Sequence, residues 1–267
     1  MKNVLLSYIG SFIDKSNFVK EKLINYRKKS LRIVYYHMVS DENHDYYFNN
    51  KAVKIADFKN QIIFLKEHYE IISLSSAIKL AQNNQPLTNK LVITFDDGFR
   101  ENYSVIAPIL KDLNVTATFF FTSNCIDNKD LMWRNKLLLI EKYKSIDFFK
   151  RLNEVASKFK IKKIEKKQSL MSWSKQEWPM NKKEEIVNCL WSKVVPFSVS
   201  EYLKEKKPYC TSEEIKELSA MNFEIGAHSL SHPIFNKLDY DTFKYEIKKS
   251  AESISKIINR KVTTFSY

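Results

Sequence analysis

Leu91-Val92-Ile93-Thr94-Phe95-Asp96-Asp97-Gly98 is the stretch that decides the fold of this chain. Its first five residues are a continuous apolar and β-branched run, which predicts a buried strand. Two carboxylates and a glycine follow directly, so we expect the strand to end in a turn that presents Asp96 and Asp97. Taken alone, this ending also fits an ordinary turn, because Asp and Gly are common turn residues.

Strand-like and helix-like segments alternate on both sides of this stretch. Short apolar runs predict strands at residues 33–38, 71–72, 115–121, 223–225 and 262–267. Apolar spacing of about 3.6 residues predicts helices at residues 57–68, 103–110 and from 241 onward, and a further short helix is expected at 75–81. Thr211-Ser212-Glu213-Glu214 fits a capping box that opens a helix ending at Met221. This alternation predicts parallel βαβ units, arranged either as a β/α barrel or as an open sheet. In both architectures, functional residues gather at the carboxyl ends of the strands.

The alternation is interrupted between about residues 125 and 210. Helical spacing with lysine-rich polar faces recurs there without an intervening strand, at residues 131–144, 148–159 and 182–191. We therefore expect an α/β domain over residues 31–267 that carries a helical insertion at about 125–210.

The remaining residues, 1–30, are expected to form a separate helical and basic segment. Leu5, Ile9 and Phe12 recur there at helical spacing, which predicts a docking helix and allows peripheral contact with a membrane. No apolar run approaches the roughly 20 residues that span a bilayer, and the short apolar stretch lacks a signal-peptide cleavage site. We expect a cytoplasmic protein, or one peripheral to the membrane, and the sequence does not indicate its oligomeric state.

The composition narrows the functional classes. With 44% hydrophobic residues in 267, the chain can bury a core, which argues against global disorder. The net charge of +13 comes mostly from dispersed lysine, which is typical of solvated surface, although it would also attract anionic glycans or lipids. No Arg- and aromatic-rich reading element is present, so nucleic acid is not an expected partner.

His228-Ser229-Leu230-Ser231-His232 is the second informative segment. Gly226 before it and Pro233 after it argue against a regular helix, so we expect both histidines on a turn at a strand end. Two histidines and one carboxylate bind a catalytic zinc ion and leave a position open on it. The other aspartate of the Asp-Asp pair, the one that does not bind the metal, is then suited to act as a general base.

These two segments resemble the first and second motifs of the polysaccharide deacetylases with a NodB-homology domain. The resemblance covers roughly Leu31 to Tyr267, apart from the helical insertion. It implies an irregular (β/α) barrel. It also implies a metal-dependent hydrolase that removes acyl groups, most often N-acetyl, from a polysaccharide or surface glycan.

Carried over residue by residue, the resemblance makes Asp96 the catalytic base. Asp97, His228 and His232 become ligands of a divalent metal, with Zn²⁺ as the expected ion. The expected partner is an acetylated glycan.

The family's later motifs, which include its general-acid histidine, would lie beyond Tyr267, so the sequence predicts a chain truncated at its C-terminus. His37 is expected to be a core histidine, with a strand-end position near the cleft as the alternative. Two other functions stay open. One is a truncated, non-catalytic remnant that binds metal and glycan, and the other is a lysine-rich peripheral membrane adaptor.

Overall fold

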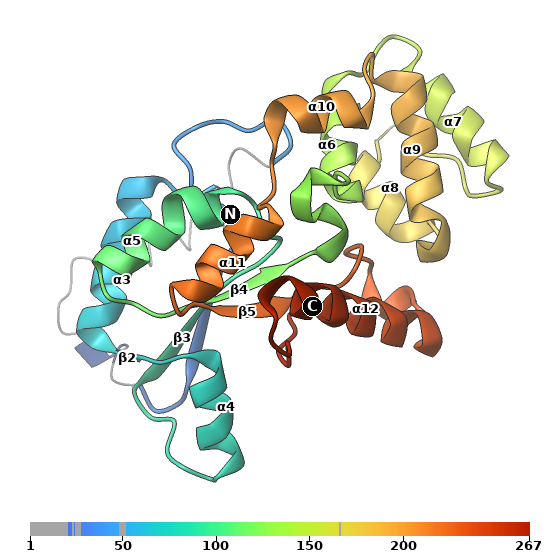
Figure 1. Ribbon diagram of the computed structural model, residues 1–267. Helices are drawn as coiled ribbons and strands as arrows, with labels where there is room; N and C mark the ends of the chain where they lie inside the picture. The colour runs from blue at the N-terminus through green and yellow to red at the C-terminus, as the bar shows by residue number, and fades with distance from the viewer. Residues whose placement is uncertain (1–20, 23, 25–27, 48–51, 166) are drawn as a thin grey trace.

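A parallel β-sheet forms the centre of the molecule (Figure 1). The computed structural model describes residues 21–22, 24, 28–47, 52–165 and 167–267. Its strands are β1 (Arg32–Tyr36), β2 (Glu70–Ile71), β3 (Lys90–Phe95), β4 (Thr118–Phe121) and β5 (Glu224–Ala227). They run in the order β1-β3-β4-β5, and β2 pairs with the beginning of β3. The predicted α/β fold is confirmed, and the described strands form an open sheet.

The deciding stretch forms the central strand β3. Its residues from Leu91 to Phe95 are all buried, as expected for a parallel strand that is covered on both faces. β1 pairs with it along its whole length, and β4 pairs with its carboxyl-terminal end. The outer strand β1 differs from the expected buried run, because Ile33 and Tyr35 are 54% and 66% exposed. Its side chains alternate between the core and an open face.

Helices cover the sheet and connect its strands. The α-helices outside the β4–β5 connection are α3 (Ile55–His68), α4 (Leu74–Gln82), α5 (Ala107–Asp112) and α12 (Tyr240–Ile258), and α11 (Ser212–Ala220) is the last helix of that connection, directly before β5. A π-helical turn, η1 (Asn102–Ile106), precedes α5, where the sequence predicted one continuous α-helix. Thr211 and Glu214 form the expected capping box at the start of α11.

Before α11, the described chain that leads on from β4 is helical, and most of it lies to one side of the sheet (Figure 1). Its elements are η2 (Ser123–Asn128), α6 (Trp133–Lys142), α7 (Phe148–Lys158), α8 (Leu170–Glu177), η3 (Met180–Lys182), α9 (Lys183–Val194) and α10 (Val199–Lys206). The three helices predicted here are confirmed, and α8 and α10 are additional. These helices share a hydrophobic core around four buried tryptophans, Trp133, Trp173, Trp178 and Trp191. We call α6–α10 the helical lobe.

The last described residues reach the outer side of β5 as a single bridge between Ala227 and Phe265. Two backbone hydrogen bonds of 3.0 Å hold it, from Ala227 N–H to the Thr264 carbonyl and from Ser266 N–H to the Ala227 carbonyl. The strand predicted at 262–267 is therefore reduced to a bridge. The predicted N-terminal helix around Leu5 to Phe12 lies outside the described residues.

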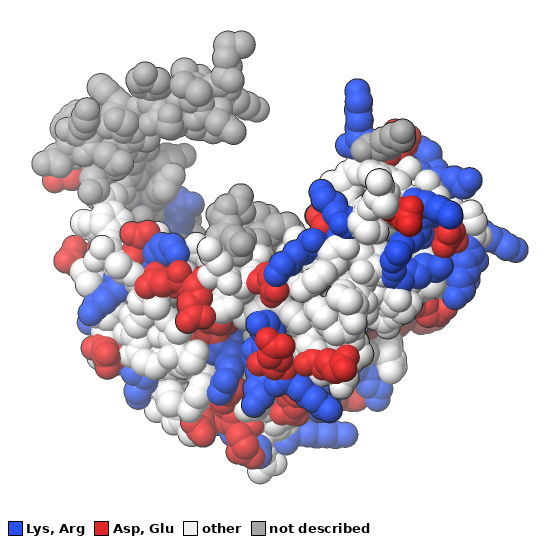
Figure 2. Space-filling model, turned by 90° about the horizontal axis from the view of Figure 1, so that it is seen from above, with Lys and Arg blue, Asp and Glu red and all other residues white. Residues whose placement is uncertain are grey.

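Charged side chains are mixed over the surface. In Figure 2, Lys and Arg are scattered among Asp and Glu and do not form one basic patch on the face that is seen. This distribution agrees with the interpretation of dispersed lysine as solvated surface. Among the described residues, no helix has the length and apolar character needed to cross a bilayer.

Candidate metal centre

Asp96 and Asp97 follow the last residue of β3. The backbone N–H of Asp96 donates to the Tyr36 carbonyl at 2.9 Å, so the sheet still fixes this position. The chain then turns through positive φ angles of 72° at Asp97 and 77° at Gly98. A Cβ at Gly98 would lie 2.6 Å from the Phe121 ring, so glycine allows the turn to pack closely against β4.

The two histidines lie on the loop that follows β5. The backbone N–H of His228 donates to the Phe121 carbonyl at 2.9 Å. Positive φ angles at Ser229 (64°) and His232 (54°) then fold the loop back, and the Ser229 hydroxyl accepts the His232 N–H at 2.9 Å. The imidazole rings end 4.8 Å apart. The predicted non-helical turn is confirmed.

Asp97, His228 and His232 converge on one point. The Nε2 atoms of His228 and His232 lie 3.4 and 3.3 Å from Asp97 Oδ1, and one ligand atom from each residue lies within 4.8 Å of the others. Asp97 Oδ1 is buried and has no hydrogen-bond partner among the described residues. Two imidazoles and an unpartnered carboxylate oxygen that face one another fit a divalent cation such as Zn²⁺.

Neighbouring groups set the orientation and the ionisation of these three side chains. His228 Nδ1 lies 2.9 Å from the Ser266 carbonyl oxygen, and an N–H donated there leaves the Nε2 lone pair directed at Asp97. Burial would raise the pKa of Asp97, but the two imidazoles hold it well below its usual range. Burial lowers the pKa of His232, whereas at His228 the Asp97 carboxylate outweighs burial and raises the pKa. The carboxylate is therefore ionised and available to a metal.

Asp96 lies beside this triad and has a different environment. The Ser266 hydroxyl donates to its Oδ2 at 3.3 Å, while its Oδ1 is buried without a hydrogen-bond partner in the described part of the chain. Burial raises the pKa of Asp96, and the nearby charge of Asp97 adds to this effect. Asp96 also lines a cavity of about 1110 Å³ together with His228 and His232. The two adjacent aspartates thus differ in protonation behaviour and in position.

His37 lies at the carboxyl end of β1 and lines the same cavity as Asp96. It is half-buried, so the expected core position is wrong and the alternative position at the cleft is confirmed. The apolar run at 33–38 predicted burial because the sequence cannot show that one face of β1 stays uncovered.

Glu246 on α12 is a site residue that the sequence reasoning missed. Its buried carboxylate accepts the backbone N–H groups of Leu230 and Ser231, each at 2.9 Å, and the Ser231 hydroxyl at 2.5 Å. It therefore holds the loop between the two histidines. Its position on a long lysine-rich helix gives no local signal of this role.

The helical lobe also contacts this loop. Trp133 Nε1 donates to the His232 carbonyl at 2.8 Å, and Lys183 Nζ donates to the Ser231 hydroxyl at 2.7 Å. Arg134, the second residue of α6, lines the cavity of Asp96. These contacts join residues far apart in sequence, so neither motif predicts them.

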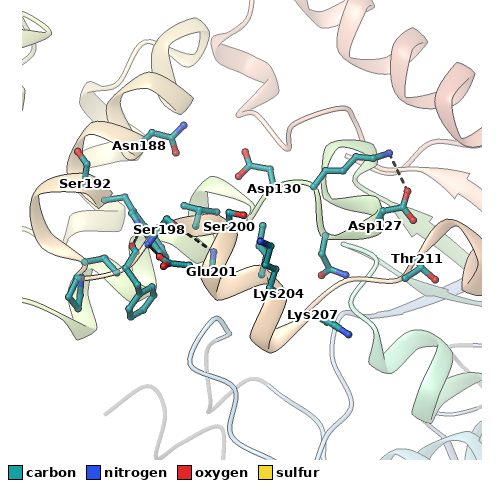
Figure 3. A pocket seen from close by; sticks show the side chains of 18 residues that line it. Asp127, Asp130, Asn188, Ser192, Ser198, Ser200, Glu201, Lys204, Lys207 and Thr211 are labelled. Carbon is teal, nitrogen blue, oxygen red and sulfur yellow. Dashed lines mark hydrogen bonds and ion pairs between the residues drawn. The ribbon is translucent and has the colours of Figure 1, made fainter.

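A second cavity, of about 1170 Å³, lies between α9, α10 and η2 (Figure 3). Its polar lining includes Asp130, Asn188 and Lys204. It shares no lining residue with the triad, so we place the functional centre at the strand ends.

Comparison with known proteins agrees with this geometry. Residues 83–267 match the sequence profile of the family described as "Polysaccharide deacetylase". The Bacillus subtilis (strain 168) protein named "Putative polysaccharide deacetylase YxkH" is 28% identical over 118 residues, which are 43% of this chain and 39% of that relative's length.

Two solved structures have a similar fold at 16% sequence identity each. The Streptococcus pyogenes deacetylase PplD in complex with acetate gives a TM-score of 0.54 over 89% of this chain and 73% of its own. IcaB from Ammonifex degensii gives a TM-score of 0.53 over 90% of this chain and 74% of its own. The family profile covers most of the chain, including both the Asp-Asp turn and the histidine loop. This chain is a member of the polysaccharide deacetylase family.

Proposed function

We propose that this protein hydrolyses N-acetyl groups on a glycan with the help of a divalent metal ion. We propose Zn²⁺ as this ion, because the candidate ligands are two imidazoles and one carboxylate. One observation carries the proposal: Asp97, His228 and His232 face one another directly beside the separate carboxyl group of Asp96. Two imidazoles and one carboxylate would hold the ion and leave room for further ligands. Such an ion supplies a water of lowered pKa and polarises the acyl carbonyl.

Asp96 is the general base in this proposal. It is not one of the three convergent ligands, it lines the cavity, and burial raises its pKa toward the range that suits proton transfer. It accepts a proton as a water oxygen adds to the acyl carbon. When the carbon–nitrogen bond breaks, the amine nitrogen needs a proton, and we assign its delivery to His37, which lines the same cavity.

Acetate release from N-acetylglucosamine tetramers tests this function. The protein loaded with Zn²⁺ should release acetate, a chelator should stop the release, and added Zn²⁺ should restore it. Asp96→Asn should lower the rate by about 10²–10⁴-fold, as expected for loss of a general base, while the protein still takes up one metal ion.

Asp112→Asn is the matched control, because it makes the same change at an exposed position on α5 and should keep full activity. Full activity in Asp96→Asn would overturn the role of this residue. Metal uptake without acetate release by the unaltered protein, on this substrate and on other N-acetylated glycans, would instead favour a non-catalytic metal- and glycan-binding protein.

A further inference from the structure

Arg134 is a cation that the helical lobe places beside the metal centre. It lines the 1110 Å³ cavity that contains Asp96 and His228, and also a neighbouring cavity of about 380 Å³ that contains Asp97. The adjacent Trp133 is anchored to the histidine loop, and the Arg134 guanidinium lies over the Trp133 ring, 5.2 Å from its centroid. The position of this cation relative to the centre is therefore fixed by the fold.

The guanidinium is not neutralised by a direct contact. Its Nε is buried and has no hydrogen-bond partner among the described residues, and none of their carboxylates forms an ion pair with it. Burial lowers its pKa while the charge of Asp97 opposes this, and a guanidinium keeps its proton in proteins. A charged donor without a partner at a partly buried position is unfavourable, so the binding of a ligand that pairs with it is favoured.

Two other cations of the helical lobe provide a contrast. Lys136 is fully buried, but it pairs with Asp130 at 2.8 Å and donates to Asn188 at 2.9 Å. Lys183 is also buried, and it donates to Ser231 and pairs with Glu184. Both lysines have partners within the fold, which gives them a structural role, whereas Arg134 directs its charge toward the cavities.

We propose that Arg134 binds an anionic oxygen group, a carboxylate or a phosphate, that the glycan carries close to the acyl group to be removed. This inference rests on the proposed function. A guanidinium matches such groups with two parallel hydrogen bonds, which adds geometric selectivity to the charge. The cavity of about 1110 Å³ exceeds the usual range for a small-ligand pocket, so it has room for a substituted or neighbouring sugar. Arg134 thus selects anionic glycans over neutral ones.

Calorimetric titration of the Zn²⁺-loaded protein with matched probes tests this selectivity. The carboxylate arm compares a hyaluronan tetrasaccharide with an N-acetylglucosamine tetramer. The phosphate arm compares N-acetylglucosamine 6-phosphate with N-acetylglucosamine. We expect the anionic member of at least one pair to bind about tenfold more tightly or better, and the arm that responds identifies the group.

Arg134→Gln should reduce this preference to within about twofold, and Arg134→Lys should keep only part of it, because an ammonium cannot form the paired hydrogen bonds. Arg260→Gln, which removes the same charge at an exposed position, should bind like the unaltered protein and so controls for general attraction to a basic protein. If Arg134→Gln does not fold, Arg134→Lys is the deciding variant. Its preference for the anionic probe over the neutral one should then be at least about threefold smaller than that of the unaltered protein.

An unchanged preference in folded Arg134 variants, or equal binding of neutral and anionic probes by the unaltered protein, would overturn the inference. Because binding is measured without turnover, an Arg134-dependent preference combined with no acetate release would refute the proposed function alone. Acetate release from neutral glycans with no Arg134-dependent preference would refute this inference alone.

Discussion

Glu246→Gln is expected to weaken metal binding, although Glu246 lies on α12 and is not one of the three convergent residues. Its Oε2 accepts the N–H groups of Leu230 and Ser231, and its Oε1 accepts the Ser231 hydroxyl. A glutamine keeps one oxygen for the two N–H groups but presents an NH₂ group to the Ser231 hydroxyl. The oxygen of that hydroxyl already accepts a hydrogen bond from the Lys183 ammonium, so the hydroxyl must donate its own proton to Glu246. An NH₂ group cannot accept that proton, and the hydrogen bond would be lost.

The magnitude follows from these contacts. Hydrogen bonds to a charged group contribute about 1.5–3 kcal/mol each, so the loss of one should lower the free energy of unfolding by about that amount in Glu246→Gln. Glu246→Ala leaves two backbone N–H groups and the Ser231 hydroxyl proton without their acceptor, and should cost roughly 3–5 kcal/mol. A loop that is less well held should bind metal about 10–100-fold more weakly, as found for groups that orient metal ligands.

Competition with a chromophoric chelator measures the Zn²⁺ affinity, and urea denaturation of the metal-free protein measures the stability. Glu252→Gln is the control on the same helix, because the Glu252 side chain is 43% exposed and pairs with the surface lysines Lys248 and Lys249. It should change neither quantity measurably. Metal affinity within twofold of the unaltered protein in both Glu246 variants would refute the idea that this carboxylate positions the histidine loop.

Three further outcomes are expected. Gly226→Ala should lower the free energy of unfolding by about 1–3 kcal/mol in denaturant titration, because its Cβ would lie 2.3 Å from Phe120 Cε1; an unchanged midpoint would contradict this. Burial raises the pKa of Asp45, but the Tyr202 hydroxyl and the Lys142 ammonium outweigh burial, so the pKa is lowered in the folded protein. Ionised Asp45 therefore stabilises the fold at pH values above its pKa in the unfolded chain, and this contribution disappears as the pH falls. The stability difference between the unaltered protein and Asp45→Asn, followed by thermal unfolding, should therefore be largest above about pH 5 and should shrink toward pH 3; a difference that does not change with pH would count against the pairing. Removing Zn²⁺ that is present at a hundredfold excess over its Kd should lower the unfolding free energy by about 2.7 kcal/mol and the Tm by several degrees, whereas a Tm independent of Zn²⁺ would argue against specific binding.

The fold was predictable where one local pattern dominated. The run that became β3 is both apolar and β-branched, and its residues from Leu91 to Phe95 are all buried in the centre of the sheet. The capping box at Thr211 was readable because its two partners lie three residues apart. The helix α10 was missed although Ser198 and Glu201 form a similar box, so its signal was present in the sequence.

Other features could not be read from local patterns. The expected apolar face of α12 is present, but Phe243 is 38% exposed and lines the cavity with Ile247, whereas Ile254 is buried in the core. Periodicity shows which residues share a face of a helix, but it does not show what that face meets. For the same reason Ile33 on β1 was expected to be buried and is exposed.

The sequence by itself determined the candidate site residues: Asp96, Asp97, His228 and His232 are recognisable because residue type and spacing indicate the chemistry that they could perform. Only the tertiary structure decided how these groups are arranged and supported. Parallel pairing of β3, β4 and β5 brings the two motifs together, while α12 supplies Glu246 and the helical lobe supplies Arg134. The physical reason is that hydrogen bonds and charges act through space, so a supporting residue far away in the chain leaves no mark on the motif that it holds.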